Sequence, residues 1–191
     1  MTTRPLRADA QRNRDRLLEA AVAAFSRDAD VPLEAIAKAA GVGIGTLYRH
    51  FPTREALVEA AYRNELARLC DAADDLLLDL PPDVAMRTWM DRFVGYMTTK
   101  RGMADALRAV IASGGDPYAH SRDRMVAAIT AFLRPAPRPG PRPARCGRRR
   151  TSGDVLAGLS GVSLAAGDPA RREQAGRLLD LLMDGLRYRP A

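Results

Sequence analysis

The fold is decided by residues 33–51, LEAIAKAAGVGIGTLYRHF. The first half of this stretch carries apolar residues at helical spacing, and Pro32 before it is well suited to open a first helical turn. Gly41 stands where a left-handed cap would end that helix. A second short segment, residues 44–51, places Leu47 on its apolar side and small or polar residues elsewhere. The stretch predicts two short helices that meet at a glycine turn.

The flanking sequence extends this helical pattern in both directions. Upstream, residues 1–14 have the composition of a basic arm that runs into a helix ending near Asp28. Downstream, Pro52 ends the second short helix and Thr53 can cap a long helix that continues to Pro81. A loop is predicted at residues 113–117. Further helices are expected near residues 83–102, 103–111, 125–133, 154–166 and 170–187.

Composition supports an all-α fold of about nine helices. Alanine, arginine and leucine dominate, and no segment alternates apolar and polar residues for long. No apolar run is long enough for a membrane span. Cys70 and Cys146 lie far apart in a chain without a signal peptide, which favours a reduced, cytoplasmic setting.

The net charge of +7 is not a reliable sign of nucleic-acid binding, because one segment accounts for all of it. Residues 134–150 hold seven arginines and no acid, so the rest of the chain is formally neutral. The same residues include five prolines and cannot form a helix. The anomalous region 134–152 is interpreted as a flexible basic linker, an accessory nucleic-acid tail or a stretch read out of frame in a GC-rich gene. We assign this region no function.

Residues 33–57 resemble the DNA-binding signature of the TetR family of transcriptional regulators. The resemblance rests on Ala37, the pair Gly41-Val42, the run GTLYRHF at 45–51, Arg54 and Leu57. It implies an N-terminal three-helix helix-turn-helix domain over residues 1–52 and a helical effector-binding and dimerisation domain over residues 53–191. The expected function is that of a ligand-responsive repressor that binds a pseudo-palindromic DNA operator as a homodimer.

The second helix of a helix-turn-helix enters the major groove, so its outer face must be small or able to form hydrogen bonds. By position in the family, Ile44, Gly45 and Thr46 would face bases, whereas Tyr48, His50 and Arg54 would hold the DNA backbone. Arg49 is a further candidate for base contact. Gly43 departs from the family, which often has a polar residue there. Because few side chains are left to read bases, the arm arginines Arg4 and Arg7 are predicted to add phosphate or minor-groove contacts.

The remaining helices offer weaker predictions. An apolar effector pocket could be lined by Trp89, Phe93, Tyr96, Met97, Met103, Leu107 and Met125, although such stripes are also what an ordinary core requires. The dimer interface is expected on the last two helices, at Leu159, Val162, Leu178, Leu182 and Leu186.

Other classes of function fit the sequence less well. With two histidines, no nucleophile elbow and no metal-spaced cluster, neither an enzyme nor a metal or cofactor site is expected. The glycines at 41–45 follow a helix rather than a strand, which argues against a nucleotide loop. The pattern is also compatible with a helical hairpin buried in a core, with an activator, or with an interaction module whose DNA binding is weakened.

Overall fold

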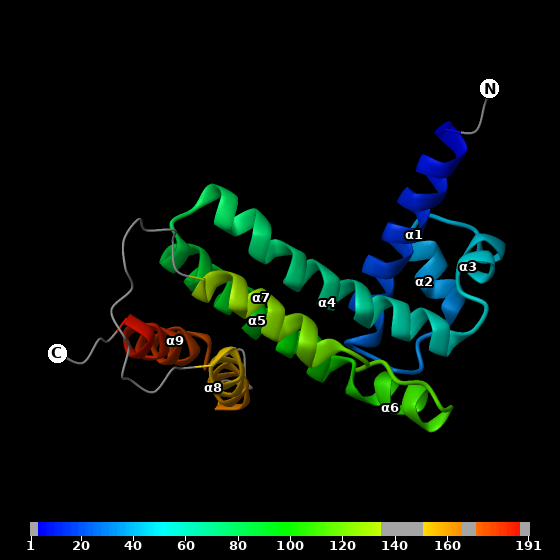
Figure 1. Ribbon diagram of the computed structural model, residues 1–191. Helices are drawn as coiled ribbons and strands as arrows, with labels where there is room; N and C mark the ends of the chain where they lie inside the picture. Colours follow the sequence, from blue (N-terminus) through cyan, green and yellow to red (C-terminus); the bar gives the residue numbers. More distant parts are fainter. Residues whose placement is uncertain (1–3, 135–150, 166–170, 188–191) are drawn as a thin grey trace. The chain divides into compact units, whose positions relative to one another are not determined.

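The computed structural model describes residues 4–134, 151–165 and 171–187, and the side chains among them from residue 8 onward. This part of the chain holds nine helices and no strand, as the composition predicts (Figure 1). The helices are α1 (Arg4–Phe25), α2 (Leu33–Ala39), α3 (Ile44–His50), α4 (Arg54–Asp79), α5 (Pro82–Gly102), α6 (Ala104–Ala112), α7 (Ser121–Leu133), α8 (Ser152–Ala165) and α9 (Arg172–Arg187).

The chain divides into two compact units that do not follow a single cut in the sequence. Unit 1 contains the described residues up to Ala67 together with Thr98–Ala119, and unit 2 contains Arg68–Met97 and the described residues from His120 onward. Both α4 and α5 therefore continue from one unit into the other. The domain boundary predicted at residues 52 and 53 falls inside unit 1 and stays a prediction.

Helix α1 starts earlier than the sequence pattern predicts. Residues 1–14 were expected to form an arm ahead of the helix, whereas α1 begins at Arg4. No apolar stripe marks its first turns, but polar pairs along the helix support them. Gln11 donates to the Asp15 carboxylate at 2.7 Å, and Arg12 pairs with Asp9. The basic arm is thus a helical extension from Arg4 onward.

The core of unit 1 is built from buried side chains of α1, α2, α3, the first half of α4 and α6. Helices α1, α2 and α3 contact one another, and Figure 1 shows them grouped together in blue and cyan. The apolar stripes predicted for these segments supply the buried side chains. Those with almost no exposed surface include Leu17, Phe25, Ile36, Leu47, Leu57, Met103 and Leu107.

The turn between α6 and α7 is tied to unit 1 by Tyr118. The Tyr118 ring meets the Tyr62 ring edge-on, with 5.3 Å between centroids, and the Lys100 ammonium lies 4.3 Å from the Tyr118 ring centre. The Arg63 guanidinium donates to the Asp116 carbonyl at 3.3 Å. Burial lowers the pKa of Lys100. Partial burial raises the pKa of Tyr118.

Unit 2 is organised around Trp89, which has no exposed surface. Its indole N–H donates to the Leu69 carbonyl at 2.7 Å, and its ring lies 5.9 Å from Phe93 and 5.8 Å from Phe132, measured between centroids. Helix α8 packs on both α7 and α9. The buried indole N–H therefore has its hydrogen-bond partner within unit 2.

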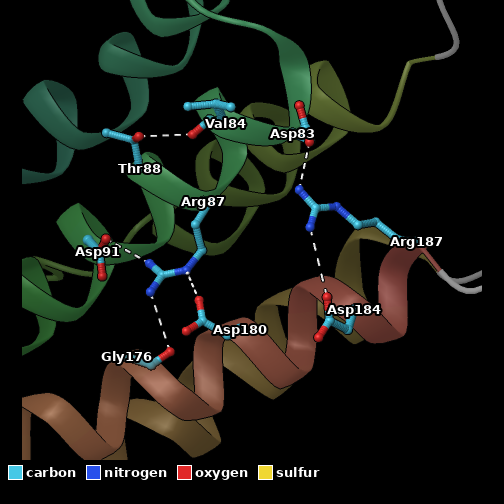
Figure 2. A network of polar contacts seen from close by, with 9 residues as sticks. All are labelled: Asp83, Val84, Arg87, Thr88, Asp91, Gly176, Asp180, Asp184 and Arg187. Atoms are coloured by element: carbon cyan, nitrogen blue, oxygen red, sulfur yellow. Dashed lines mark hydrogen bonds and ion pairs between the residues drawn. The ribbon is translucent and has the colours of Figure 1, made fainter.

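A set of ion pairs joins α5 to α9 in unit 2 (Figure 2). The Arg87 guanidinium pairs with Asp91 and Asp180, each at 2.7 Å, and donates to the Gly176 carbonyl at 3.3 Å. Arg187 pairs with Asp83 at 2.6 Å, a contact that lowers the pKa of Asp83. The sequence predicts helix α5 near residues 83–102. Helix α5 instead begins one residue earlier, at Pro82.

Candidate DNA-binding site

The turn between α2 and α3 has the geometry that its glycine predicts. Gly41 adopts φ +66°, in the left-handed region where a side chain is strained. The Gly41 amide donates to the Lys38 carbonyl at 3.1 Å, and the Val42 amide donates to the Ala37 carbonyl at 3.0 Å. These two bonds form a Schellman motif, which satisfies the last carbonyls of α2. The prediction of a left-handed cap at this glycine is confirmed.

Helix α3 is anchored on one side and open on the other. Leu47 has no exposed surface and Phe51, just after the helix, is 2% exposed. Tyr48 is 46% exposed, and Arg49 is exposed as well. Because adjacent residues of a helix point about 100° apart, burial of Leu47 aims the neighbouring side chains outward. Within the part of unit 1 that the structure describes, this face of α3 is uncovered.

Two glycines at the start of α3, the N-cap Gly43 and Gly45 inside the helix, leave open space beside the backbone. A Cβ built on Gly43 or Gly45 meets no atom within 4 Å. Neither glycine has a positive φ, and Gly43 has φ −72°. At Gly45, which lies inside the helix, glycine costs about 1 kcal/mol relative to alanine. A free helix face that lacks side-chain bulk fits close approach by a second molecule.

The other predicted base contacts lie around these glycines. Ile44 and Thr46 are half-exposed at the start of α3. The N-terminus of α3 has no side-chain cap, because Gly43 stands where the family often has a polar residue. His50 is half-buried in the last turn, with its ring 6.1 Å from that of Phe51. The structure thus brings Ile44, Gly45, Thr46, Tyr48, Arg49 and His50 together on one short helix.

The arginines of α1 differ in how far they are engaged. The guanidinium of Arg14 lies 4.9 Å from the centre of the Phe51 ring, so it stacks against the end of α3. Arg12 pairs with Asp9, and Arg16 donates to Asn13. The side chains of Arg4 and Arg7 lie outside the described part, so their predicted DNA contacts stay predictions. Arg14 is a contact of α3 that the sequence pattern did not reveal, because its partner is far along the chain.

Arg54 makes contacts within the protein that the sequence did not predict. Its guanidinium donates to the Ala29 carbonyl at 3.0 Å and to the Val31 carbonyl at 2.6 Å. It also lies 5.6 Å from the centre of the Phe25 ring. The predicted DNA backbone contact of Arg54 stays a prediction, and these protein contacts were not foreseen because they span 23 to 25 residues.

The residues predicted to line an effector pocket do not all fall in one unit. Met103 and Leu107 belong to unit 1, and the other five belong to unit 2. Trp89, Phe93 and Tyr96 are buried, as core residues are, while Met97 and Met125 are half-exposed. A cleft of about 460 Å³ in unit 1 is lined instead by residues 27–30, the start of α4 and α6. The effector site therefore stays a prediction.

The predicted dimer residues occupy two kinds of position in unit 2. Leu159 is fully buried, and Leu182 lies over Gly158, where an added Cβ would be 3.3 Å from its Cδ1. Val162, Leu178 and Leu186 are half-exposed. The sequence pattern did not single out Leu164 and Leu181, which are 73% and 67% exposed on the same two helices.

Metal-binding and membrane-spanning features are both missing from the part of the chain that the structure describes. No group of three or more His, Cys, Asp or Glu side chains among these residues is placed to hold a metal ion. In the same residues no helix combines the length and the apolar character that crossing a bilayer requires.

Cys70 is a free, half-buried cysteine, and its burial raises the pKa of the thiol.

Comparison with known proteins agrees with the geometry. Residues 17–61 match the family described as bacterial regulatory proteins, tetR family, and residues 81–188 match the C-terminal domain of SbtR-like transcriptional regulators. No curated protein matches the chain.

Solved structures of transcriptional regulators are similar over nearly the whole chain. A TetR transcriptional regulator from Streptomyces coelicolor is 51% identical, with a TM-score of 0.79 over 91% of this chain and 97% of that one. A TetR regulatory protein from Mycobacterium vanbaalenii is 29% identical, with a TM-score of 0.67 over 95% and 98%. LfrR from Mycobacterium smegmatis, in complex with proflavine, shares the fold at 22% identity, with a TM-score of 0.61 over 93% and 95%. The chain belongs to the TetR family of bacterial transcriptional regulators, and α2, the turn at Gly41 and α3 form its helix-turn-helix.

Proposed function

We propose that the protein is a homodimeric repressor that inserts α3 into the major groove of a pseudo-palindromic operator and leaves it when a small apolar effector binds. The observation that carries the DNA-binding step is the open face of α3, where Gly43 and Gly45 have free space and Leu47 anchors the opposite side. Helices with this arrangement reach base edges without steric conflict. Because operator DNA lies in the bacterial cytoplasm, the proposal places the protein there.

Roles within α3 follow from exposure and chemistry. Thr46 and Arg49 have hydrogen-bonding groups for base edges, and Ile44 offers an apolar contact to a thymine methyl group. Tyr48 and His50 are suited to donate to phosphate oxygens. Arg4 and Arg7 would add contacts from the start of α1. Specificity would therefore depend on a small number of side chains.

The dimer would form through α8 and α9. Leu164 and Leu181 expose large apolar side chains, and Gly161 and Gly185 have open space where a second helix could approach. Half-exposed Val162, Leu178 and Leu186 extend the apolar surface. A two-fold dimer would place two recognition helices about one turn of DNA apart, which a single chain cannot do.

The effector and the sign of regulation rest on family membership. TetR regulators commonly repress and respond to small molecules, and unit 2 supplies an aromatic interior around Trp89, Phe93 and Tyr96. An activator would differ in its effect on transcription and not in the way α3 binds DNA.

Footprinting of the purified protein on its own upstream DNA tests the proposal. We expect two protected half-sites whose centres lie about 10 base pairs, or a multiple of that, apart. In a gel-retardation assay, the affinity for this DNA should fall steeply as the salt concentration rises, since phosphate contacts release counterions. Weak retardation without a protected site would instead favour a helical interaction module that has lost specific DNA binding.

A further inference from the structure

The side chain of Arg54, the first residue of α4, binds the loop between α1 and α2. Its two terminal nitrogens donate to the carbonyls of Ala29 and Val31 at 3.0 and 2.6 Å. Arg54 itself is half-buried, so both bonds are partly screened from water.

The amides of residues 26–28 bond back to the end of α1, whereas the second half of the loop has few hydrogen bonds of its own. Asp30 donates its amide to the Asp28 side chain at 2.9 Å, and Pro32 has no amide proton to donate. Pro32 is also the N-cap of α2, where no side chain caps the helix. The start of α2 is therefore held by the backbone bonds from the Ala35 and Ile36 amides to the Pro32 carbonyl, without a side-chain cap.

The shape of the arginine side chain matches this position. A guanidinium is planar and carries donors in a fixed fork, so it can reach two carbonyls two residues apart while its face lies over Phe25, with 5.6 Å to the ring centre. The ammonium of a lysine has the same charge but neither the plane nor the fork. A DNA phosphate, in contrast, can accept from either side chain.

We propose that Arg54 is a positioning residue, which holds the α1–α2 loop so that α2, and α3 packed on it, keep the orientation that enters the groove. Its effect on operator binding would then come through the protein and not through its charge. This inference rests on the proposed function for its effect on DNA, but its effect on the loop is independent of DNA.

The variants R54K and R54A separate the two roles, with R49A as the control. Arg49 is an exposed arginine of α3 for which the structure shows no side-chain partner among the described residues. Hydrogen exchange of residues 29–36 in the free protein measures the loop and the first turn of α2. Operator affinity over a range of salt concentrations measures phosphate contacts, each of which contributes about one unit to the salt slope.

If Arg54 positions the loop, R54K and R54A both speed exchange at residues 29–36 by roughly tenfold, as expected for loss of about 1.4 kcal/mol of local stability. Both also weaken operator binding by a similar factor without changing the salt slope. R49A leaves the exchange unchanged. The exchange result decides the role of Arg54 in the loop even if the wild-type protein binds no DNA.

Three results would overturn the inference. R54K could keep wild-type exchange and affinity while R54A lowers the salt slope by about one, which is the behaviour of a phosphate contact. Exchange could increase over all of unit 1 with no excess at residues 29–36, which would indicate general destabilisation. Exchange in R54K could also match the wild type while its affinity falls. If R54A does not fold, R54K decides alone, because it keeps the charge and most of the aliphatic stem.

Discussion

Gly102, the last residue of α5, lies in direct contact with Ser26, which follows the last residue of α1. A Cβ added at Gly102 would come within 3.0 Å of both the Ser26 Cβ and the Ser26 carbonyl oxygen. Part of the obstacle is backbone, so it cannot be removed by a change of rotamer. This contact shows how residues 98–119 come to share a unit with the N-terminal helices.

The variant G102A should therefore destabilise the protein. The added methyl group forces α5 and the end of α1 apart, and overpacking of this kind costs about 1–3 kcal/mol. Thermal or urea unfolding followed by circular dichroism measures the change. The matched control is G95A on the same helix, where a Cβ meets nothing within 4 Å. Equal stability of the two variants would contradict the close packing at Gly102.

The start of α8 should be sensitive to acid through Asp154. The Thr151 amide and hydroxyl both donate to the Asp154 carboxylate at 2.8 Å, and the Asp154 amide donates to the Thr151 hydroxyl at 3.1 Å. These bonds lower the pKa of Asp154 below its usual 3.8. The unfolded chain binds the proton more readily, so the carboxylate stabilises the fold above pH 3.8, and this contribution is lost as pH falls below it.

The variant D154N should accordingly be less stable than the wild type at about pH 6, and the difference should shrink as pH falls toward about 3. Urea midpoints of both proteins across this range provide the measurement. Comparing the two proteins cancels other acid-sensitive groups, such as Asp83 in its pair with Arg187. A difference that does not depend on pH would show that the carboxylate charge has no part in the cap.

The sequence predicts those features of the site that depend on residues close together in the chain. The structure confirms the turn at Gly41, the cap at Thr53, and the burial of Leu47 next to exposed Tyr48. Each of these features depends on neighbours within four residues. Thr53 accepts the Ala56 amide at 3.1 Å, as a residue before a helix should.

What the sequence could not provide depends on contacts between distant residues. Neither the two loop carbonyls bound by Arg54 nor the Ser26 contact of Gly102 leaves a periodic signal in the chain. The early start of α1 was missed for another reason, because its first turns rely on polar pairs and have no apolar stripe.

The dimer proposal predicts that a charge on α9 separates the two chains. In L181D a carboxylate would be buried against the partner, at a cost larger than most dimer interfaces tolerate. Because Leu181 is 67% exposed in the single chain, the fold itself should be unaffected. Sedimentation analysis should show a dimer for the wild type and a monomer for L181D.

The control for this experiment is L78D, which changes a leucine of α4 that is 85% exposed and not part of the proposed interface. It should remain dimeric. A dimeric L181D, or a monomeric wild type at micromolar concentration, would argue against an interface through α8 and α9.

The proposed function depends above all on the exposed face of α3 at Gly43 and Gly45, which has no side chains and is free to approach DNA. The variant G45A places a methyl group on that face. Alanine is the better helix former by about 1 kcal/mol and meets no atom of the protein, so the variant should be at least as stable as the wild type. Affinity for the footprinted operator is then compared with that of G95A, an open-space glycine remote in sequence from the recognition helix. We predict at least tenfold weaker binding for G45A and wild-type binding for G95A. Full operator affinity in a stable G45A protein would show that the recognition helix does not need this face to be bare.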